Sequence, residues 1–143
     1  MIEIQRSALV AYTPAQMFDL VNDVEAYPSR FSWCAGAEVQ SHDAHNLTAR
    51  LDLRFAGLQH SFSTHNSLQR PQRLEMRLAG GPLRELDGTW TFIALGEHGC
   101  KVALDLQFDF SSRLIGQAFR LGFRGLADRL VDDFCAEARR IYG

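Results

Sequence analysis

Alternation of apolar and polar residues dominates the middle of the chain and predicts antiparallel strands. In residues 50–55, for example, leucines and a phenylalanine alternate with two arginines and an aspartate. Such a strand places one face on a core and the other in water. Strand-like patterns occur at residues 2–12, 37–41, 50–55, around Phe62, and at 73–78, 89–92 and 101–110. The chain is therefore expected to form a half-buried, curved antiparallel sheet of about six or seven strands.

A short helix is expected after the first strand. Thr13 precedes Pro14, and threonine is a good N-cap while proline suits the first turn of a helix. Apolar residues with helical spacing follow at Met17, Phe18, Leu20, Val21 and Val24. The Tyr27-Pro28 pair is expected to end this helix, because the residue before a proline is disfavoured in the α region.

A much longer helix is predicted between Leu114 and Tyr142, where the chain contains no proline. Its length would be about 40 Å at a rise of about 1.5 Å per residue. Apolar residues recur with the spacing of one helix face at Ala118, Phe119, Gly122, Phe123, Leu126, Leu130, Phe134, Ala138 and Ile141. The order strand, helix, run of strands and long helix predicts an α+β fold with helices on one face of the sheet.

A sheet that packs on so long a helix is expected to leave a cavity. A twisted sheet cannot follow a straight helix along its whole length, so the two layers separate somewhere. The predicted lining is rich in aromatic and large aliphatic side chains and suits an apolar ligand. It comprises Phe55, Phe62, Met76, Leu86, Trp90, Phe92, Phe108, Phe119, Phe123 and Leu126. Plain core packing is the alternative for each of these residues.

Three glycines in the predicted long helix, Gly116, Gly122 and Gly125, bear on the same question. A glycine inside a helix costs about 1 kcal/mol relative to alanine, so its presence needs a reason. Room for a ligand is one explanation, and close packing of the helix on the sheet or a bend in the helix is the other.

Composition narrows the class of protein without deciding its function. The 143 residues suit one domain, expected to span 1–143, and 46% hydrophobic and 22% charged residues are ordinary values for a globular protein. A net charge of −2 gives no overall attraction to nucleic acid, so DNA is not an expected partner. We find neither a secretory leader nor a membrane-spanning stretch, which predicts a cytoplasmic protein.

The chemistry-bearing residues form no familiar catalytic or metal-binding motif. Cys34, Cys100 and Cys135 are isolated from one another, which favours buried reduced thiols over disulfides or a zinc site. The sequence contains neither a phosphate-binding loop nor a metal-ligand pattern such as HExxH. No metal ligand and no catalytic residue is therefore assigned.

Motifs spread over essentially the whole chain carry a family resemblance. They are RSALVAYTPAQMFDLVNDVEAYPSRFSWC at 6–34, FSTHNSL at Phe62 to Leu68, Gly80-Gly81-Pro82, LRELDGTWTF at Leu83 to Phe92, and VDDFCAEARRIYG at 131–143. Together they resemble the coenzyme Q-binding and ribosome-association toxin family of the polyketide cyclase and START-like group. The resemblance implies a helix-grip fold of the START/Bet v 1-like type, which agrees with the predicted layout.

The resemblance implies two different roles. Mitochondrial members are regarded as ubiquinone-binding proteins that support respiration, so ubiquinone or another isoprenoid lipid is the expected ligand, with transient membrane contact as a further implication. Bacterial members are regarded as toxins of toxin–antitoxin systems that bind the large ribosomal subunit and block subunit joining. Older usage calls the group oligoketide cyclases. Binding of a hydrophobic small molecule is the expected chemistry, and ribosome association is the alternative role.

Each role requires a different set of residues. An apolar ligand needs no catalytic group, and His60 and Asn66, which share the face of Phe62 by alternation, are expected to be polar groups of the cavity. Ribosome binding needs a basic face for phosphates, unless the same charges are simply a solvated helix face. The candidate arginines for such a face are Arg113, Arg120 and Arg124. A cyclase would need an acid or base inside the cleft, and the thin set of candidates favours a non-enzymatic role.

Overall fold

The structure confirms the predicted order of elements and the α+β class. It is a computed structural model that describes residues 1–55, 57–110 and 116–143. Its elements are β1 (Ile2–Val10), α1 (Pro14–Asn22), η1 (Val24–Ala26), α2 (Tyr27–Arg30), β2 (Cys34–His42), β3 (Asn46–Phe55), β4 (Leu58–Gln69), β5 (Arg73–Gly80), β6 (Leu83–Leu95), β7 (Gly99–Phe110) and α3 (Gln117–Tyr142).

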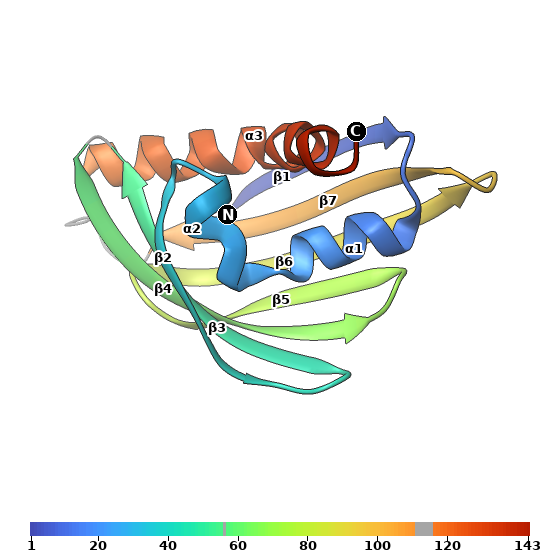
Figure 1. The fold of residues 1–143 in the computed structure, drawn as a ribbon. Helices are drawn as coiled ribbons and strands as arrows, with labels where there is room; N and C mark the ends of the chain where they lie inside the picture. The colour runs from blue at the N-terminus through green and yellow to red at the C-terminus, as the bar shows by residue number, and fades with distance from the viewer. Residues whose placement is uncertain (56, 111–115) are drawn as a thin grey trace.

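The strands form one antiparallel sheet that curves around the long helix. Within the described residues the sheet has seven strands in the order β1-β7-β6-β5-β4-β3-β2. Figure 1 shows α3 lying across the concave side of this sheet, with α1 and α2 on the same side. Helix α3 packs against β1, β7 and β3. The layers therefore enclose a core between the inner face of the sheet and the helices.

Helix α1 begins as the sequence predicts. The Thr13 hydroxyl accepts a hydrogen bond from the Gln16 backbone N–H, and the Gln16 side chain accepts one from the Thr13 N–H. This capping box satisfies two of the otherwise unpaired donors at the helix start. The apolar stripe then faces the core, where Phe18 packs edge-on against Phe92 of β6.

The predicted helix end at Tyr27-Pro28 is wrong. Helix α1 already ends at Asn22, and Tyr27 begins the short helix α2 with φ −54° and ψ −43°. Proline is tolerated in the first turn of a helix because the N–H group it lacks would have no partner there. The buried Tyr27 hydroxyl donates to the Val21 carbonyl, which ties α2 to the end of α1.

Helix α3 buries a broader face than the one predicted. Gly116 is its N-cap, and the predicted start at Leu114 lies outside the described residues. Ile141, expected to face inward, is 38% exposed. Val131 and Cys135, outside the predicted stripe, are buried. Helix α3 packs against the edge strand β1 as well as against β7 and β3, so it buries more than one narrow stripe of its residues.

The three cysteines are buried and free, as expected of reduced thiols. Burial raises the pKa of each thiol above its usual range. A raised thiol pKa leaves little of the reactive thiolate at neutral pH. These cysteines therefore contribute as small apolar side chains of the core.

Candidate functional site

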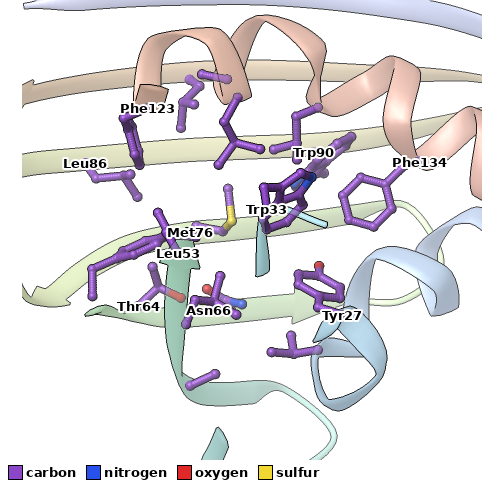
Figure 2. Close-up of a pocket in the computed structure, with 18 residues that line it drawn as sticks. Tyr27, Trp33, Leu53, Thr64, Asn66, Met76, Leu86, Trp90, Phe123 and Phe134 are labelled. Atoms are coloured by element: carbon purple, nitrogen blue, oxygen red, sulfur yellow. The ribbon is translucent and has the colours of Figure 1, made fainter. Parts of the chain in front are cut away.

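An apolar cavity lies between the sheet and α3. Its volume is about 80 Å³. Figure 2 shows Phe123 and Phe134 on the helix side of it and Thr64, Asn66 and Met76 on the sheet side. The residues that line it are Val24, Tyr27, Trp33, Ala49, Leu51, Leu53, Phe62, Thr64, Asn66, Met76, Leu86, Trp90, Leu106, Phe123, Leu126, Ala127, Leu130 and Phe134. The lining suits a ligand that is mostly hydrocarbon.

One buried polar atom in the cavity lining, Oδ1 of Asn66, lacks a hydrogen-bond partner among the described residues. Asn66 is only 5% exposed, and its Oδ1 atom accepts no hydrogen bond from any described residue. Thr64, two residues earlier on the same face of β4, is equally buried. A buried polar atom without a partner costs free energy, so a native protein usually supplies one from the protein, water or a ligand. Asn66 is therefore the natural polar contact for a bound molecule.

An aromatic cluster forms one end of the cavity. Phe134 of α3 packs edge-on against Tyr27, Phe31 and Trp90, at ring separations of 5.5, 4.8 and 5.4 Å. Trp33 stacks on Phe31 with ring centroids 5.0 Å apart. This cluster joins α2, the start of β2 and the sheet to the long helix. It therefore fixes the shape of the cavity at this end.

A polar contact holds Trp33 in this position. The indole N–H of Trp33 donates to the Asp133 carboxylate across 3.1 Å, and the two residues are 100 positions apart in the chain. Burial raises the pKa of Asp133, and the bond from Trp33 opposes that rise. Of the described lining residues, Tyr27 alone carries a titratable group, and burial raises its pKa far above the usual range.

The cavity is smaller than an ordinary small-molecule site. Small-molecule sites usually measure roughly 300–1,000 Å³, several times the volume found here. Met76 is the side chain best suited to move, because methionine is unbranched and flexible. Gly88 makes room for it: a β-carbon at Gly88 would lie 2.7 Å from the Met76 terminal methyl carbon. A bound ligand would therefore displace side chains such as Met76.

The structure brings seven of the predicted site residues to the cavity wall. These are Phe62, Asn66, Met76, Leu86, Trp90, Phe123 and Leu126. Phe55, Phe92 and Phe108 are buried in the core but do not line the cavity. Phe119 is likewise core, and its ring lies 4.4 Å from the His60 ring, so His60 contacts this aromatic packing rather than the cavity.

Sequence reasoning missed the end of the cavity built from α2 and the start of β2. Tyr27 and Trp33 lie in or beside short irregular segments, where no period marks an inward face. The apolar residues of the SRFSWC stretch were the only available signal. Phe134 was predicted to face inward but not to reach the ligand site.

The glycines of α3 have different explanations. A β-carbon at Gly122 would lie 2.6 Å from Cγ of Phe55, so close packing on β3 accounts for this glycine. At Gly125 the nearest atom would be Nη1 of Arg129, 3.1 Å away. Gly116 is the N-cap, and a β-carbon there would meet nothing within 4 Å. None of the three opens onto the cavity.

The structure describes two of the three arginines of the predicted basic face. Arg113 lies outside the described residues. The Arg120 guanidinium lies over the Phe110 ring, 4.9 Å from its centroid. Arg124 is exposed and forms no ion pair with any described residue. Arg129 and Arg54 are also exposed without such a pair, but Asp128, Asp132 and Asp133 lie on the same stretch of α3 and partly balance this positive charge.

The described residues contain neither a helix that could span a membrane nor a cluster that could hold a metal ion. None of the described helices is both long enough and apolar enough to cross a membrane. Histidine, cysteine, aspartate and glutamate side chains do not gather there into a group of three or more that could hold a metal ion.

Comparisons with known proteins place the chain in a family. A family model described as polyketide cyclase / dehydrase and lipid transport matches residues 10–135. The ribosome association toxin RatA of Pseudomonas aeruginosa is 41% identical over 140 residues, covering 98% of this chain and 97% of that protein. Coenzyme Q-binding protein COQ10 homolog B of Xenopus laevis mitochondria is 26% identical over 147 residues, covering 99% of this chain and 60% of that protein.

A solved structure agrees with these matches. The Zhui aromatase/cyclase from Streptomyces sp. R1128 superposes with a TM-score of 0.84 at 15% identity, covering 99% of this chain and 96% of that one. At this identity the likeness establishes a shared fold and carries no information about activity. The chain therefore belongs to the polyketide cyclase / dehydrase and lipid transport family, and within it to the group of the ribosome association toxins and coenzyme Q-binding proteins that its motifs resemble.

Proposed function

We propose that the protein binds an isoprenoid quinone, or a similar apolar molecule with one polar group, in the cavity between the sheet and α3. The observation that carries this proposal is the unpartnered Oδ1 atom of Asn66 in an otherwise apolar cavity. This oxygen can accept a hydrogen bond from a hydroxyl group, such as that of the reduced quinone. Burial of hydrocarbon would supply the affinity at about 25 cal/mol per Å², and Asn66 would orient the polar end. The distant coenzyme Q-binding relative supports the choice of a quinone.

Native mass spectrometry of gently purified protein, followed by solvent extraction, tests the proposal directly. A quinone or other lipid that co-purifies with the wild type would support it. A wild type that is empty after growth with abundant quinone, and that takes up no ubiquinone with a single isoprene unit, would contradict it.

Replacement of Asn66 by leucine is expected to change stability and affinity in opposite directions. The free energy of unfolding should rise by about 1 kcal/mol, because a buried amide with an unpaired atom is removed. Affinity for the reduced form of ubiquinone with one isoprene unit should fall about 10-fold, because its hydroxyl loses the Asn66 Oδ1 acceptor. Urea denaturation and binding titration measure the two quantities. Ser67→Ala, on the exposed face of the same strand, is the control and should change neither. Unchanged affinity in Asn66→Leu would exclude Asn66 as the polar contact.

Association with the large ribosomal subunit is the second candidate function. The observation that favours it is the 41% identity to a ribosome association toxin over nearly the full length of both chains. The exposed Arg124 and its neighbouring arginines on α3 offer contacts for RNA phosphates. Arg124 does not line the cavity, so a contact of Arg124 with the ribosome can be tested separately from ligand binding in the cavity.

Substitution of Arg124 by glutamine is expected to weaken ribosome binding in a salt-dependent way. If Arg124 contacts a phosphate, the slope of log affinity against log salt should fall by about 1. Co-sedimentation with purified large subunits over a salt series measures this slope. Arg77→Gln on β5, where Arg77 is 76% exposed, is the matched control. Identical slopes for the wild type and both variants would exclude Arg124 from an RNA contact.

A further inference from the structure

A long groove runs along α3 outside the cavity. It lies between this helix and the end of β3 and has a volume of about 730 Å³. Ala118, Gly122 and Gly125 form its helix side, and Phe55 contributes from β3. Gly122 allows Phe55 to lie against the helix backbone. The groove therefore has an apolar floor close to the helix axis.

Leu121 adds exposed apolar surface to this groove. Its side chain lines the groove and is 62% exposed. Arg54 and Arg129 also line it, and neither forms an ion pair with a described residue. Long arginine side chains can cover apolar surface with their stems while the charge stays in water. Hydrocarbon could therefore lie on the floor beneath these stems.

Trp33 separates the groove from the cavity. It is among the lining residues of both spaces. Its indole donates a hydrogen bond to Asp133, which also lines the groove, and packs against the rings of Phe31 and Tyr27. Rotation of this one side chain would break that bond and these ring contacts and would join the two spaces. The groove alone has the volume of an ordinary ligand site, whereas the cavity does not, so a connection would let a ligand too large for the cavity occupy both spaces.

We propose that the groove is a second subsite, which holds the hydrocarbon chain of the ligand while the ring or head group lies in the cavity. This inference rests on the proposed function and adds to it a site for the chain. Trp33 separates the two subsites and would have to rotate for one ligand to occupy both. The ligand class is an amphiphile with a compact polar head and an alkyl or isoprenoid chain, and the chain should contribute most of the affinity.

Two benzoquinone probes with the same head group test the inference. One is ubiquinone without a side chain, and the other carries a ten-carbon chain. In the wild type the chain should strengthen binding on the order of 100-fold, the value for about three or four buried CH₂ groups. Binding is measured by titration of the intact protein in detergent-free buffer below the aggregation limit of the probe.

Gly125→Leu should remove the advantage of the chain. The new side chain would fill the groove, and the one nearby atom is the flexible end of Arg129, which can move aside. Leucine also favours helix over glycine by about 1 kcal/mol, so the variant should fold. It should bind both probes with the affinity of the chain-free one. Gln117→Leu is the matched control, because Gln117 is exposed on the same helix outside the groove, and it should behave as the wild type.

A second variant tests the groove without a substitution at Gly125, where the new side chain could alter the packing of the helix. Leu121→Ser shortens an exposed side chain and should weaken binding of the chain-bearing probe about 5-fold, while binding of the chain-free probe stays unchanged. Equal affinity of both probes for the wild type, or a full chain effect in Gly125→Leu, would overturn the inference and leave cavity binding intact. Failure of the wild type to bind either probe would overturn the proposed function as well.

Discussion

Replacement of Phe134 by alanine is expected to lower the free energy of unfolding by about 3–5 kcal/mol. Phe134 is 1% exposed and contacts three aromatic rings, two from α2 and its C-cap and one from β6. Loss of a fully buried phenylalanine removes its transfer free energy and leaves a void that the neighbours fill only in part. The melting temperature of a chain of this size should fall by about 10 °C.

Urea denaturation followed by tryptophan fluorescence measures this effect. Ile141→Ala is the matched control on the same helix, because Ile141 is 38% exposed, and it should cost less than about 1 kcal/mol. Phe134 also lines the cavity, so a bound quinone should restore part of the stability lost in Phe134→Ala. Similar costs for the two substitutions would mean that the aromatic cluster does not hold the helix to the sheet.

Replacement of Gly81 by alanine is expected to cost about 3 kcal/mol. Gly81 has φ +124°, a backbone conformation that side chains with a β-carbon rarely adopt. A β-carbon there would lie 2.6 Å from Cβ and 2.8 Å from Cα of Phe62. Backbone atoms cannot move aside as a flexible side chain can, so the turn between β5 and β6 would have to shift away from β4.

Gly57→Ala is the control for Gly81→Ala. Gly57 has φ +79°, and a β-carbon there would meet nothing within 4 Å, so backbone strain alone should cost about 1 kcal/mol. Phe62 lines the cavity, so Gly81→Ala should also weaken quinone binding whereas Gly57→Ala should not. Equal losses of stability in urea would show that the contact with Phe62 adds nothing to the backbone strain.

Two ligand subsites joined at Trp33 give a physical account of how a small cavity could serve a large molecule. The cavity supplies one polar contact at Asn66 and a close apolar fit. The groove supplies open apolar surface at the molecular boundary. A ligand that fills only one of the two would lose either its orientation or most of its buried area. Chain length should therefore matter as much as head-group chemistry.

The strands and their inward faces follow from the sequence alone. Side chains alternate strictly between the two faces of a strand, so once Phe62 faces inward, Thr64 and Asn66 must do so too. The same period placed Met76, Leu86 and Trp90 on the inner face. The Thr13 cap and the long apolar helix were likewise local signals. The family motifs agreed with this layout and were confirmed by the comparisons.

Which inward residues reach the cavity was decided only by the tertiary structure. Phe108 and Phe119 belong to the inner faces, but Phe123 packs against both, 4.8 and 5.8 Å away between ring centroids, so side chains fill that end of the space. At the other end Trp33 and Asp133 meet across 100 residues of chain. Local periodicity specifies the direction of a side chain, whereas the gap between two packed layers depends on contacts between segments far apart in sequence. For this reason the sequence determined the sheet, the helix and their apolar faces, and the packing between them determined the cavity, its aromatic end and the groove beyond it.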